Sequence, residues 1–230
     1  GLLPVRVTFG NGILDSAQVT RLVNVPQGRL YQFGSDWRMF TFPFTYQGLA
    51  DDPTDVFTDE NGNPLAPGTF QIVRYNPLNL NTPYEQVTQL RAGEGYWVRL
   101  LNVPAGGVAN VRLKGADPIK LGNTDPNGGT SLYTMTIRRG WNQIGNASPY
   151  AVRVRDLQFL VGNVLVSYDQ AVSAGLIRPA LYEWDRKRGV YVQVAKDAFV
   201  QPGRGIWIYS TNERVIALPS PYGLKLSITP

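Results

Sequence analysis

The chain has 230 residues, of which 43% are apolar and 11% aromatic, enough to bury a core in one large domain or in two domains of about 100 residues. It contains no cysteine and no histidine, which excludes disulfides, thiol or imidazole catalysis, and a zinc site of the usual nitrogen and sulfur ligands. The net charge is +5, and the excess lies in the second half, where 13 basic side chains accompany 8 acidic ones.

Short stretches of alternating apolar and polar residues recur along the first half. This alternation is typical of half-buried antiparallel strands, and turn-forming sequences such as 10–12 and 59–62 separate the stretches. The expected strands lie at residues 5–9, 30–33, 98–100 and 111–113. The sequence at Pro53 is compatible with one short helical turn. We predict no side-chain cap at the start of this turn.

The second half continues the pattern and adds one well-signalled helix. Ser167 and Gln170 have the spacing of a capping box, and Gly175 supplies the left-handed residue that ends such a helix. Further alternating stretches lie at 132–137, 190–194 and 224–228. The sequence therefore predicts an all-β fold with one short helix near residues 167–174.

The two halves of the chain repeat one another. Trp37 and Trp141 open matching segments, and Trp97 and Trp207 close them after similar intervals. The shared positions are glycine, proline and large apolar residues, which form turns and cores. We therefore predict two tandem antiparallel β-sandwich-like or barrel-like domains of similar fold, at residues 1–115 and 116–230, with the four tryptophans in the core.

The second copy resembles a β-rich repeat module of secreted and surface-anchored bacterial proteins. The resemblance rests on a Gly-Trp-Asn-x-Ile-Gly-Asn-x-x-Pro opening at 140–149, a short helix at 171–177 and a Pro-Gly-x-Gly-Tyr-Trp-Val closing at 202–208. Ile206 replaces the usual Tyr, and in the first copy Met39 and Phe40 stand where the opening has Gln and Ile. The resemblance implies an extracellular accessory module, and no catalytic residue carries over from it.

Two polar patterns have a structural interpretation. The Gly-x-Gly turns around Glu94 and Arg204 run into strands rather than helices, which argues against phosphate binding. Asp59, Asn61 and Asn63 have the oxygen spacing of a calcium loop, although the later positions of such a loop are missing. We expect a hairpin turn there and no cofactor, with calcium as the alternative.

Aromatic and basic residues in loops are the candidates for ligand or partner contacts. Trp184 is the tryptophan most expected to be exposed, because it lies two residues after Tyr182 and precedes a basic turn. The separated basic spots are interpreted as solvated surface rather than as a nucleic-acid site. The candidate contact residues are Tyr84, Tyr150, Tyr182, Trp184, Arg186, Lys187 and Arg188.

The combined pattern predicts a structural protein rather than an enzyme. We expect a non-catalytic extracellular or cell-surface subunit of an envelope layer, filament or larger assembly, whose signal peptide has been removed and which has no transmembrane segment. Strand-like sequences at 2–9 and 223–228 would pair with other subunits to form an oligomer or polymer. The alternative is a carbohydrate-binding module that stacks sugars on exposed aromatic residues.

Overall fold

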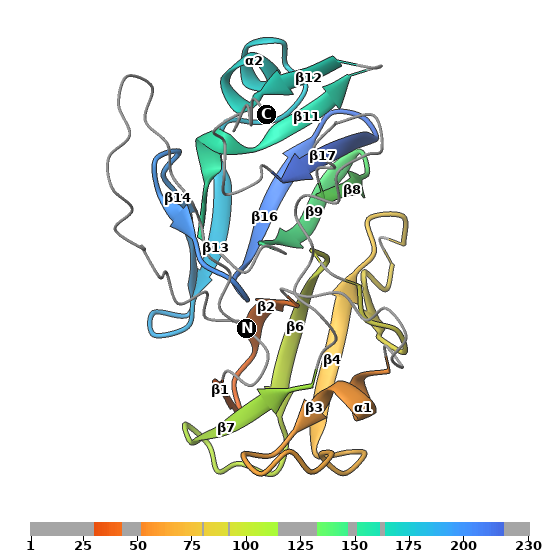
Figure 1. The fold of residues 1–230 in the computed structure, drawn as a ribbon, viewed down its shortest axis with the longest axis vertical. Helices are drawn as coiled ribbons and strands as arrows, with labels where there is room; N and C mark the ends of the chain where they lie inside the picture. The colour runs from red at the N-terminus through yellow and green to blue at the C-terminus, as the bar shows by residue number, and fades with distance from the viewer. Residues whose placement is uncertain are drawn as a thin grey trace, which may run out of the picture.

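The structure is a computed structural model that describes residues 30–42, 52–79, 81–91, 93–114, 133–146, 151–161 and 164–218. In these residues the chain consists mainly of antiparallel strands with two short helices, so the all-β prediction is confirmed. Figure 1 shows two bodies, which we call the first module (residues 30–114) and the second module (residues 133–218). The predicted boundary near residue 115 lies outside the described residues.

The first module is built from two antiparallel sheets with the strand orders β1-β7-β3 and β2-β6-β4-β5. Its strands and helix are β1 (Leu30–Gly34), β2 (Arg38–Thr41), α1 (Pro53–Val56), β3 (Phe57–Thr58), β4 (Phe70–Tyr75), β5 (Tyr84–Gln86), β6 (Gly95–Leu100) and β7 (Val108–Leu113). The predicted strands at 30–33, 98–100 and 111–113 correspond to β1, β6 and β7, whereas the one at 5–9 lies outside the described residues.

The second module has the corresponding sheets, β12-β11-β17-β8 and β14-β13-β16-β9, and a two-stranded ribbon of β10 and β15. Its elements are β8 (Tyr133–Ile137), β9 (Gly140–Gly145), β10 (Val152–Arg153), the 3₁₀ helix η1 (Val154–Asp156), β11 (Gln158–Val161), β12 (Val164–Ser167), α2 (Tyr168–Ser173), β13 (Leu181–Asp185), β14 (Val190–Val194), β15 (Phe199–Val200), β16 (Gly205–Ser210) and β17 (Arg214–Leu218). The strand expected at 224–228 lies outside the described residues.

Strand register makes the two modules equivalent residue by residue in one sheet of each. Met39 on β2 lies opposite Trp97 on β6, and Gln143 on β9 lies opposite Trp207 on β16. On the other side of each tryptophan lie β4 and β13, again in matching order. The sequence repeat is therefore also a repeat of sheet order and register.

Each module encloses its own hydrophobic core, and the two cores differ in composition. The first contains a cluster of aromatic rings, in which Phe57 stacks on Phe70 with ring centroids 4.9 Å apart. The second is largely aliphatic and includes Ala171 of α2 and Leu181 of β13. Five aromatic rings described in the first core are fully buried: Phe33, Phe40, Phe42, Phe57 and Tyr96.

The four tryptophans predicted for the module cores lie elsewhere. Trp97 and Trp207 are buried as expected, but they belong to a third cluster formed by residues of both modules. Trp37 and Trp141 are partly buried at the edge of that cluster. In each module these rings lie on the face of a sheet that points away from the module's own core. The two faces, on the sheets β2-β6-β4-β5 and β14-β13-β16-β9, pack against each other.

The predicted helix is present with its capping box. The Ser167 hydroxyl accepts a hydrogen bond from the Gln170 amide at 3.2 Å, and the Gln170 side chain accepts one from the Ser167 amide at 2.8 Å. Gly175 follows with φ of 65°. The turn at Pro53 is also helical, and Asp52 caps it by accepting from the Thr54 amide at 2.8 Å, which corrects our expectation of an uncapped turn.

Candidate functional site

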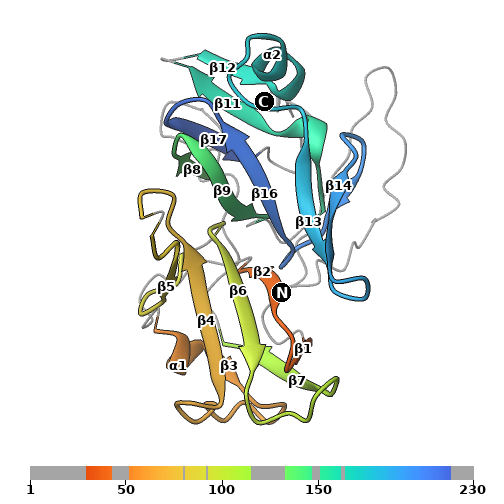
Figure 2. The same ribbon diagram turned by 180° about the vertical axis from the view of Figure 1, so that it is seen from behind.

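The most elaborate site in the described part of the chain is the junction between the two modules. We call its third hydrophobic cluster the junction cluster. Strands β9 and β16 of the second module meet β2 and β6 of the first at the waist of the molecule (Figure 2). The junction cluster contains Met39, Trp97 and Trp207 in its buried centre, surrounded by Trp37, Val73, Tyr75, Trp141, Tyr182 and Trp184.

The aromatic contacts across the junction come in matched pairs. Tyr75 of β4 packs edge-on against Trp207, with ring centroids 4.9 Å apart and an interplanar angle of 81°. Trp184 occupies the position on β13 that Tyr75 occupies on β4, and it packs in the same way against Trp97, at 5.7 Å and 79°. The modules are therefore related by an approximate twofold axis, like the halves of a symmetric dimer.

Backbone hydrogen bonds cross the junction with the same symmetry. The Thr41 amide donates to the Gly203 carbonyl at 3.3 Å, and the Gly145 amide donates to the Gly93 carbonyl at 2.9 Å. Thr41 and Gly145 are equivalent positions, as are Gly203 and Gly93. Both glycines have positive φ, 80° and 76°, which turns their carbonyls toward the opposite module.

Two further glycines permit this close approach. A Cβ atom at Gly145 would lie 2.3 Å from the Thr41 methyl carbon, and one at Gly95 would lie 2.6 Å from Cγ of Gln143. Both separations are shorter than carbon atoms tolerate. Gly145 of the opening motif and Gly95 of the closing motif therefore allow the two modules to pack closely against each other.

Ion pairs at equivalent positions have opposite polarity. In the first module Arg74 Nη1 lies 3.8 Å from Glu94 Oε1. In the second, Arg204 Nη2 lies 2.7 Å from Glu183 Oε1. Glu183 replaces Arg74 and Arg204 replaces Glu94, so a cation and an anion have exchanged places, which explains why the middle residue of the two Gly-x-Gly turns carries opposite charge.

The asparagines of the opening motif hold local structure. Asn142 accepts from the Arg138 amide at 2.8 Å and donates to the Arg138 carbonyl at 2.7 Å, which closes the turn between β8 and β9. Asn146 is buried and donates to the Val200 carbonyl at 2.8 Å. In both cases the side-chain amide forms hydrogen bonds with backbone groups that would otherwise lack a partner. Both asparagines therefore have a structural role in the folded module.

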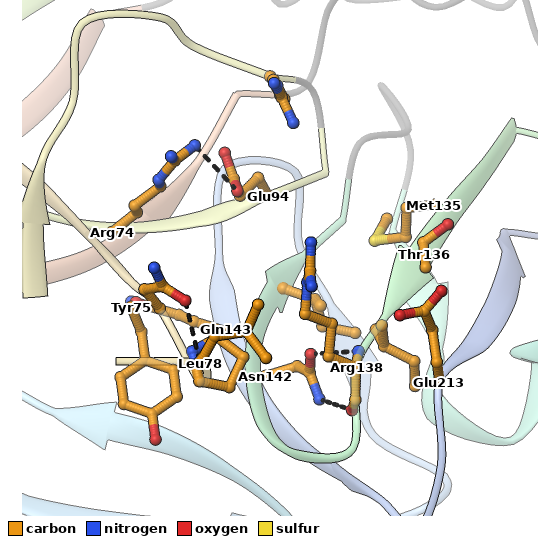
Figure 3. A pocket seen from close by; sticks show the side chains of 15 residues that line it. Arg74, Tyr75, Leu78, Glu94, Met135, Thr136, Arg138, Asn142, Gln143 and Glu213 are labelled. Carbon is orange, nitrogen blue, oxygen red and sulfur yellow. Dashed lines mark hydrogen bonds and ion pairs between the residues drawn. The ribbon is translucent and has the colours of Figure 1, made fainter. Parts of the chain in front are cut away.

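A polar cavity of about 600 Å³ opens on one side of the junction (Figure 3). We call it the junction cavity. In Figure 3, Arg74 and Glu94 lie on one side of it, and Met135, Thr136 and Glu213 on the other. Its lining consists of Arg74, Tyr75, Asn76, Pro77, Leu78, Arg91, Glu94, Met135, Thr136, Ile137, Arg138, Asn142, Gln143, Ile144 and Glu213.

The twofold relation gives the junction cavity a counterpart on the other side. This counterpart cavity has a volume of about 530 Å³ and is lined by Met39, Trp184 and Arg204, the equivalents of Gln143, Tyr75 and Glu94. Gln143 is 6% exposed, and neither atom of its side-chain amide has a hydrogen-bond partner in the structure as described. A buried amide therefore stands unpaired where the sister site has a thioether.

A third hollow, the aromatic trough, lies beside these cavities. It has a volume of about 340 Å³. Burial raises the pKa of the Tyr191 phenol, and repulsion from Tyr84 adds to the effect. Tyr191 is nevertheless 47% exposed, so the trough is open to solvent. Its lining is entirely aromatic: Tyr75, Trp141, Tyr182, Tyr191 and Trp207.

The structure brings two of the predicted contact residues into the junction. Tyr182 lines the aromatic trough and packs against Trp141, with ring centroids 5.7 Å apart. Trp184 is only partly exposed, because Trp97 and Tyr191 pack against it. Trp184 was expected to be an exposed platform, and the structure places it in the junction cluster instead, half-buried against the other module.

The three basic candidates form the turn between β13 and β14. Arg186 reaches the first module, where its Nη2 lies 3.5 Å from Asp36. Arg188 binds Asp185 at 2.7 Å, and this hydrogen bond holds the pKa of the Asp185 carboxyl below its usual value. Lys187 is exposed, and its amide donates to Asp185. Two of the three basic residues thus support the turn or the junction.

The remaining candidates are dispersed. Tyr84 is exposed on β5 and packs edge-on against Tyr75 at 5.7 Å, whereas Tyr150 lies outside the described residues. At the proposed calcium loop, Asp59 Oδ1 accepts from the amides of Asn61 and Asn63, both at 2.8 Å. The described residues hold no cluster of three metal-binding acidic side chains, so the geometry adds nothing in favour of calcium.

Sequence reasoning missed the residues that shape the junction cavity and the aromatic trough. Tyr75, Tyr191 and Gln143 were not among the candidates, although the mismatch between Met39 and Gln143 was visible in the aligned repeats. Register across the two sheets was needed to bring these residues together.

Comparisons with known proteins found no matching family model, no matching curated protein and no matching solved structure. In the described part of the chain, no helix has the length and apolar character required to cross a membrane. Function must therefore be argued from the junction and from the exposed sheet edges.

Proposed function

We propose that this chain is a non-catalytic structural protein of an extracellular or cell-surface assembly, in which it acts as a rigid two-module unit. The observation that carries the proposal is the twofold junction, where the tryptophans and glycines of both repeats hold the modules together. Backbone bonds, aromatic contacts and ion pairs all cross or flank this junction. The resemblance to modules of bacterial surface proteins supports the extracellular setting.

The acidic side chains near the junction have partners that suit a structural role. Glu94 lies near Arg74 and accepts a hydrogen bond from the Tyr96 hydroxyl at 2.6 Å. Glu183 is paired with Arg204 at 2.7 Å. Glycoside hydrolysis requires two carboxyl groups on either side of one bond, one of them able to give up a proton. Carboxylates bound to arginines in separate cavities are poorly suited to that reaction.

The edge of one sheet supports the proposed assembly. Strand β12 ends the sheet β12-β11-β17-β8, and its Val164 and Leu165 are 63% and 41% exposed. An exposed apolar edge strand is a template for pairing with another chain. The terminal segments 2–9 and 223–228 remain predicted donors for such pairing, and both lie outside the described residues.

Association should depend on this edge. We expect light scattering to show oligomers of the wild type and monomers of Leu165→Lys, because the added charge opposes strand pairing. Val108→Lys is the matched control, since Val108 is 48% exposed on a strand with neighbours on both sides. A wild type that stays monomeric up to about 1 mM, the weak end of specific association, would overturn the proposed assembly.

Carbohydrate binding is the second candidate function, and the aromatic trough is the observation that favours it. Aromatic faces bind sugars by stacking, and the trough offers five rings. Quenching of tryptophan fluorescence by polysaccharides should then be lost in Tyr191→Ala. Trp184→Ala is a poor test because Trp184 packs against Trp97. Binding that survives Tyr191→Ala would remove the trough from consideration.

A further inference from the structure

We propose that the junction cavity binds an extended polypeptide segment, with Gln143 recognising one of its backbone amide groups. This inference goes beyond self-assembly and does not require it. The first observation is Gln143, which lines the cavity and whose buried side-chain amide has no hydrogen-bond partner among the described residues. Leaving a buried donor and acceptor unpaired destabilises a protein, so such a group calls for an explanation.

The chemistry of the unpaired group indicates the class of ligand. A carboxamide presents one acceptor and one donor side by side, and a peptide group presents the complementary acceptor and donor. At the equivalent position the first module has Met39, which fills similar space without polar atoms. Folding therefore does not require an amide at this position.

The second observation is a sheet edge in the same cavity that no other described strand covers. Strand β8 is the last strand of the sheet β12-β11-β17-β8, and in the described residues it pairs only with β17. Met135 and Thr136 of β8 line the cavity (Figure 3). Ile137 of the same strand also lines it. An exposed edge strand binds an extended peptide through its own backbone groups.

Charge in the cavity favours a segment that carries an acidic residue. Arg91 and Arg138 line the cavity, and among the described residues neither forms an ion pair. Glu213 is the one lining carboxylate that the described ion pairs leave over, since Glu94 lies near Arg74. Arginines in a groove recognise carboxylates through paired hydrogen bonds.

The test uses the full chain and a phage-displayed library of linear eight-residue peptides. We expect selected peptides to bind with measurable affinity in fluorescence anisotropy, and to bind Gln143→Met at least tenfold more weakly. Methylation of the peptide backbone nitrogens should also abolish binding, because it removes strand pairing. Met39→Leu, in the counterpart cavity, is the matched control and should bind as the wild type does.

Stability separates this role from a purely structural one. Gln143→Met should unfold at a temperature no lower than that of the wild type, so that lost binding does not reflect lost folding. Failure to select any peptide, or equal binding to wild type and Gln143→Met, would overturn the proposal. Binding of an N-acetylglucosamine tetramer that is lost in Gln143→Met, without peptide binding, would instead assign the cavity to N-acetylated sugars.

Discussion

The first and second modules have the same strand order in their junction sheets, but different side chains occupy the equivalent positions at the contact between them. Thr41 faces Gly145, Met39 corresponds to Gln143, and an arginine in one ion pair corresponds to a glutamate in the other. In a homodimer both halves would have to carry the same residue at each position. Joining the halves in one chain removes that constraint, so each position can be adjusted independently.

The turns and strand-pairing positions have diverged much less than the contacts. The tryptophan at the centre of each junction sheet is retained, and so is the positive-φ glycine before each closing strand, Gly93 and Gly203. A β-branched or bulky residue is strongly disfavoured at positive φ, so these glycines are required by the backbone. Outside these retained tryptophans, contact positions such as Thr41 and Gly145 differ in a complementary way, with the larger residue of one module facing the smaller residue of the other.

The largest effect is expected when the close contact at Gly145 is broken. We predict that Gly145→Ala destabilises the protein by about 3 kcal/mol, because the new Cβ would lie 2.3 Å from the Thr41 methyl carbon and 2.7 Å from the Arg204 carbonyl oxygen. Urea unfolding followed by tryptophan fluorescence measures this directly, since Trp97 and Trp207 report on the junction.

Exchanging the two residues tests whether the contact is complementary. The double variant Thr41→Gly with Gly145→Thr should recover most of the stability lost by Gly145→Thr alone. The Thr41 hydroxyl donates to the Glu94 carbonyl at 2.7 Å, and a hydroxyl at position 145 would face the equivalent carbonyl of Arg204. If the double variant is as unstable as the sum of the single changes, the symmetry does not extend to side chains.

The second module should respond to alkaline pH through Tyr168. Burial raises the pKa of the Tyr168 hydroxyl to about 12, repulsion from Asp169 adds to the effect, and the hydroxyl donates to the Pro179 carbonyl at 2.6 Å. Because the folded pKa lies above the unfolded value of 10, this stability is complete below pH 10 and is lost as the pH rises through 12. We expect a loss of about 2 kcal/mol over that range.

Tyr168→Phe isolates this contribution from that of the other tyrosines. The variant should be less stable than the wild type by about 1 kcal/mol at pH 7, since the Pro179 carbonyl loses its donor. Between pH 10 and 12 its unfolding free energy should change less steeply than that of the wild type. Parallel pH profiles for the two proteins would contradict the assignment to Tyr168.

Reciprocal changes at Gln143 and Met39 compare the two cavities at one position. Gln143→Met should stabilise the chain by about 1–2 kcal/mol, because it removes an unpaired buried amide. Met39→Gln should destabilise it by about 2 kcal/mol, because it introduces one. Thermal unfolding of both variants measures the difference, and destabilisation by Gln143→Met would show that the amide has a partner.

Local signals in the sequence were sufficient for much of the fold. The alternating strands and the Ser167 capping box depend on neighbours within a few residues, and both are present. The Asp52 cap was missed because an aspartate before Pro-Thr is also a common turn sequence. The strands and the capping box could be predicted because each depends on interactions between residues close together in the sequence.

The junction was beyond such reasoning because it depends on long-range register. Trp97 and Trp207 were predicted to be buried, but composition cannot say which face of a strand is covered by a second module. Trp184 precedes a run of charged residues that is typical of an exposed hairpin turn. It is nevertheless covered by Trp97, which lies 87 positions earlier in the chain. Of the candidate site, the sequence singled out Tyr182, Trp184 and Arg186, and the mismatch of Met39 with Gln143 was also visible in the aligned repeats.

The smallest predicted effect concerns the ion pairs of opposite polarity. A double-mutant cycle on Arg204 and Glu183, which lie 2.7 Å apart, should give a coupling of about 0.5 kcal/mol, because both groups are partly exposed. The coupling of Arg74 with Glu94, at 3.8 Å, should be weaker, since Arg74 also binds Glu85 at 3.4 Å. Both couplings should diminish in about 1 M salt, where the screening length falls to roughly 3 Å.

Reversing the second pair gives it the polarity of the first. The double variant Glu183→Arg with Arg204→Glu should retain wild-type stability, whereas either single change places two like charges together and should cost about 0.5 kcal/mol. Equivalence of the two polarities would mean that the sign of each pair is arbitrary and only complementarity matters. A double variant less stable than both single variants would show instead that surrounding charges, such as Arg186 on the adjoining turn, fix the polarity in the second module.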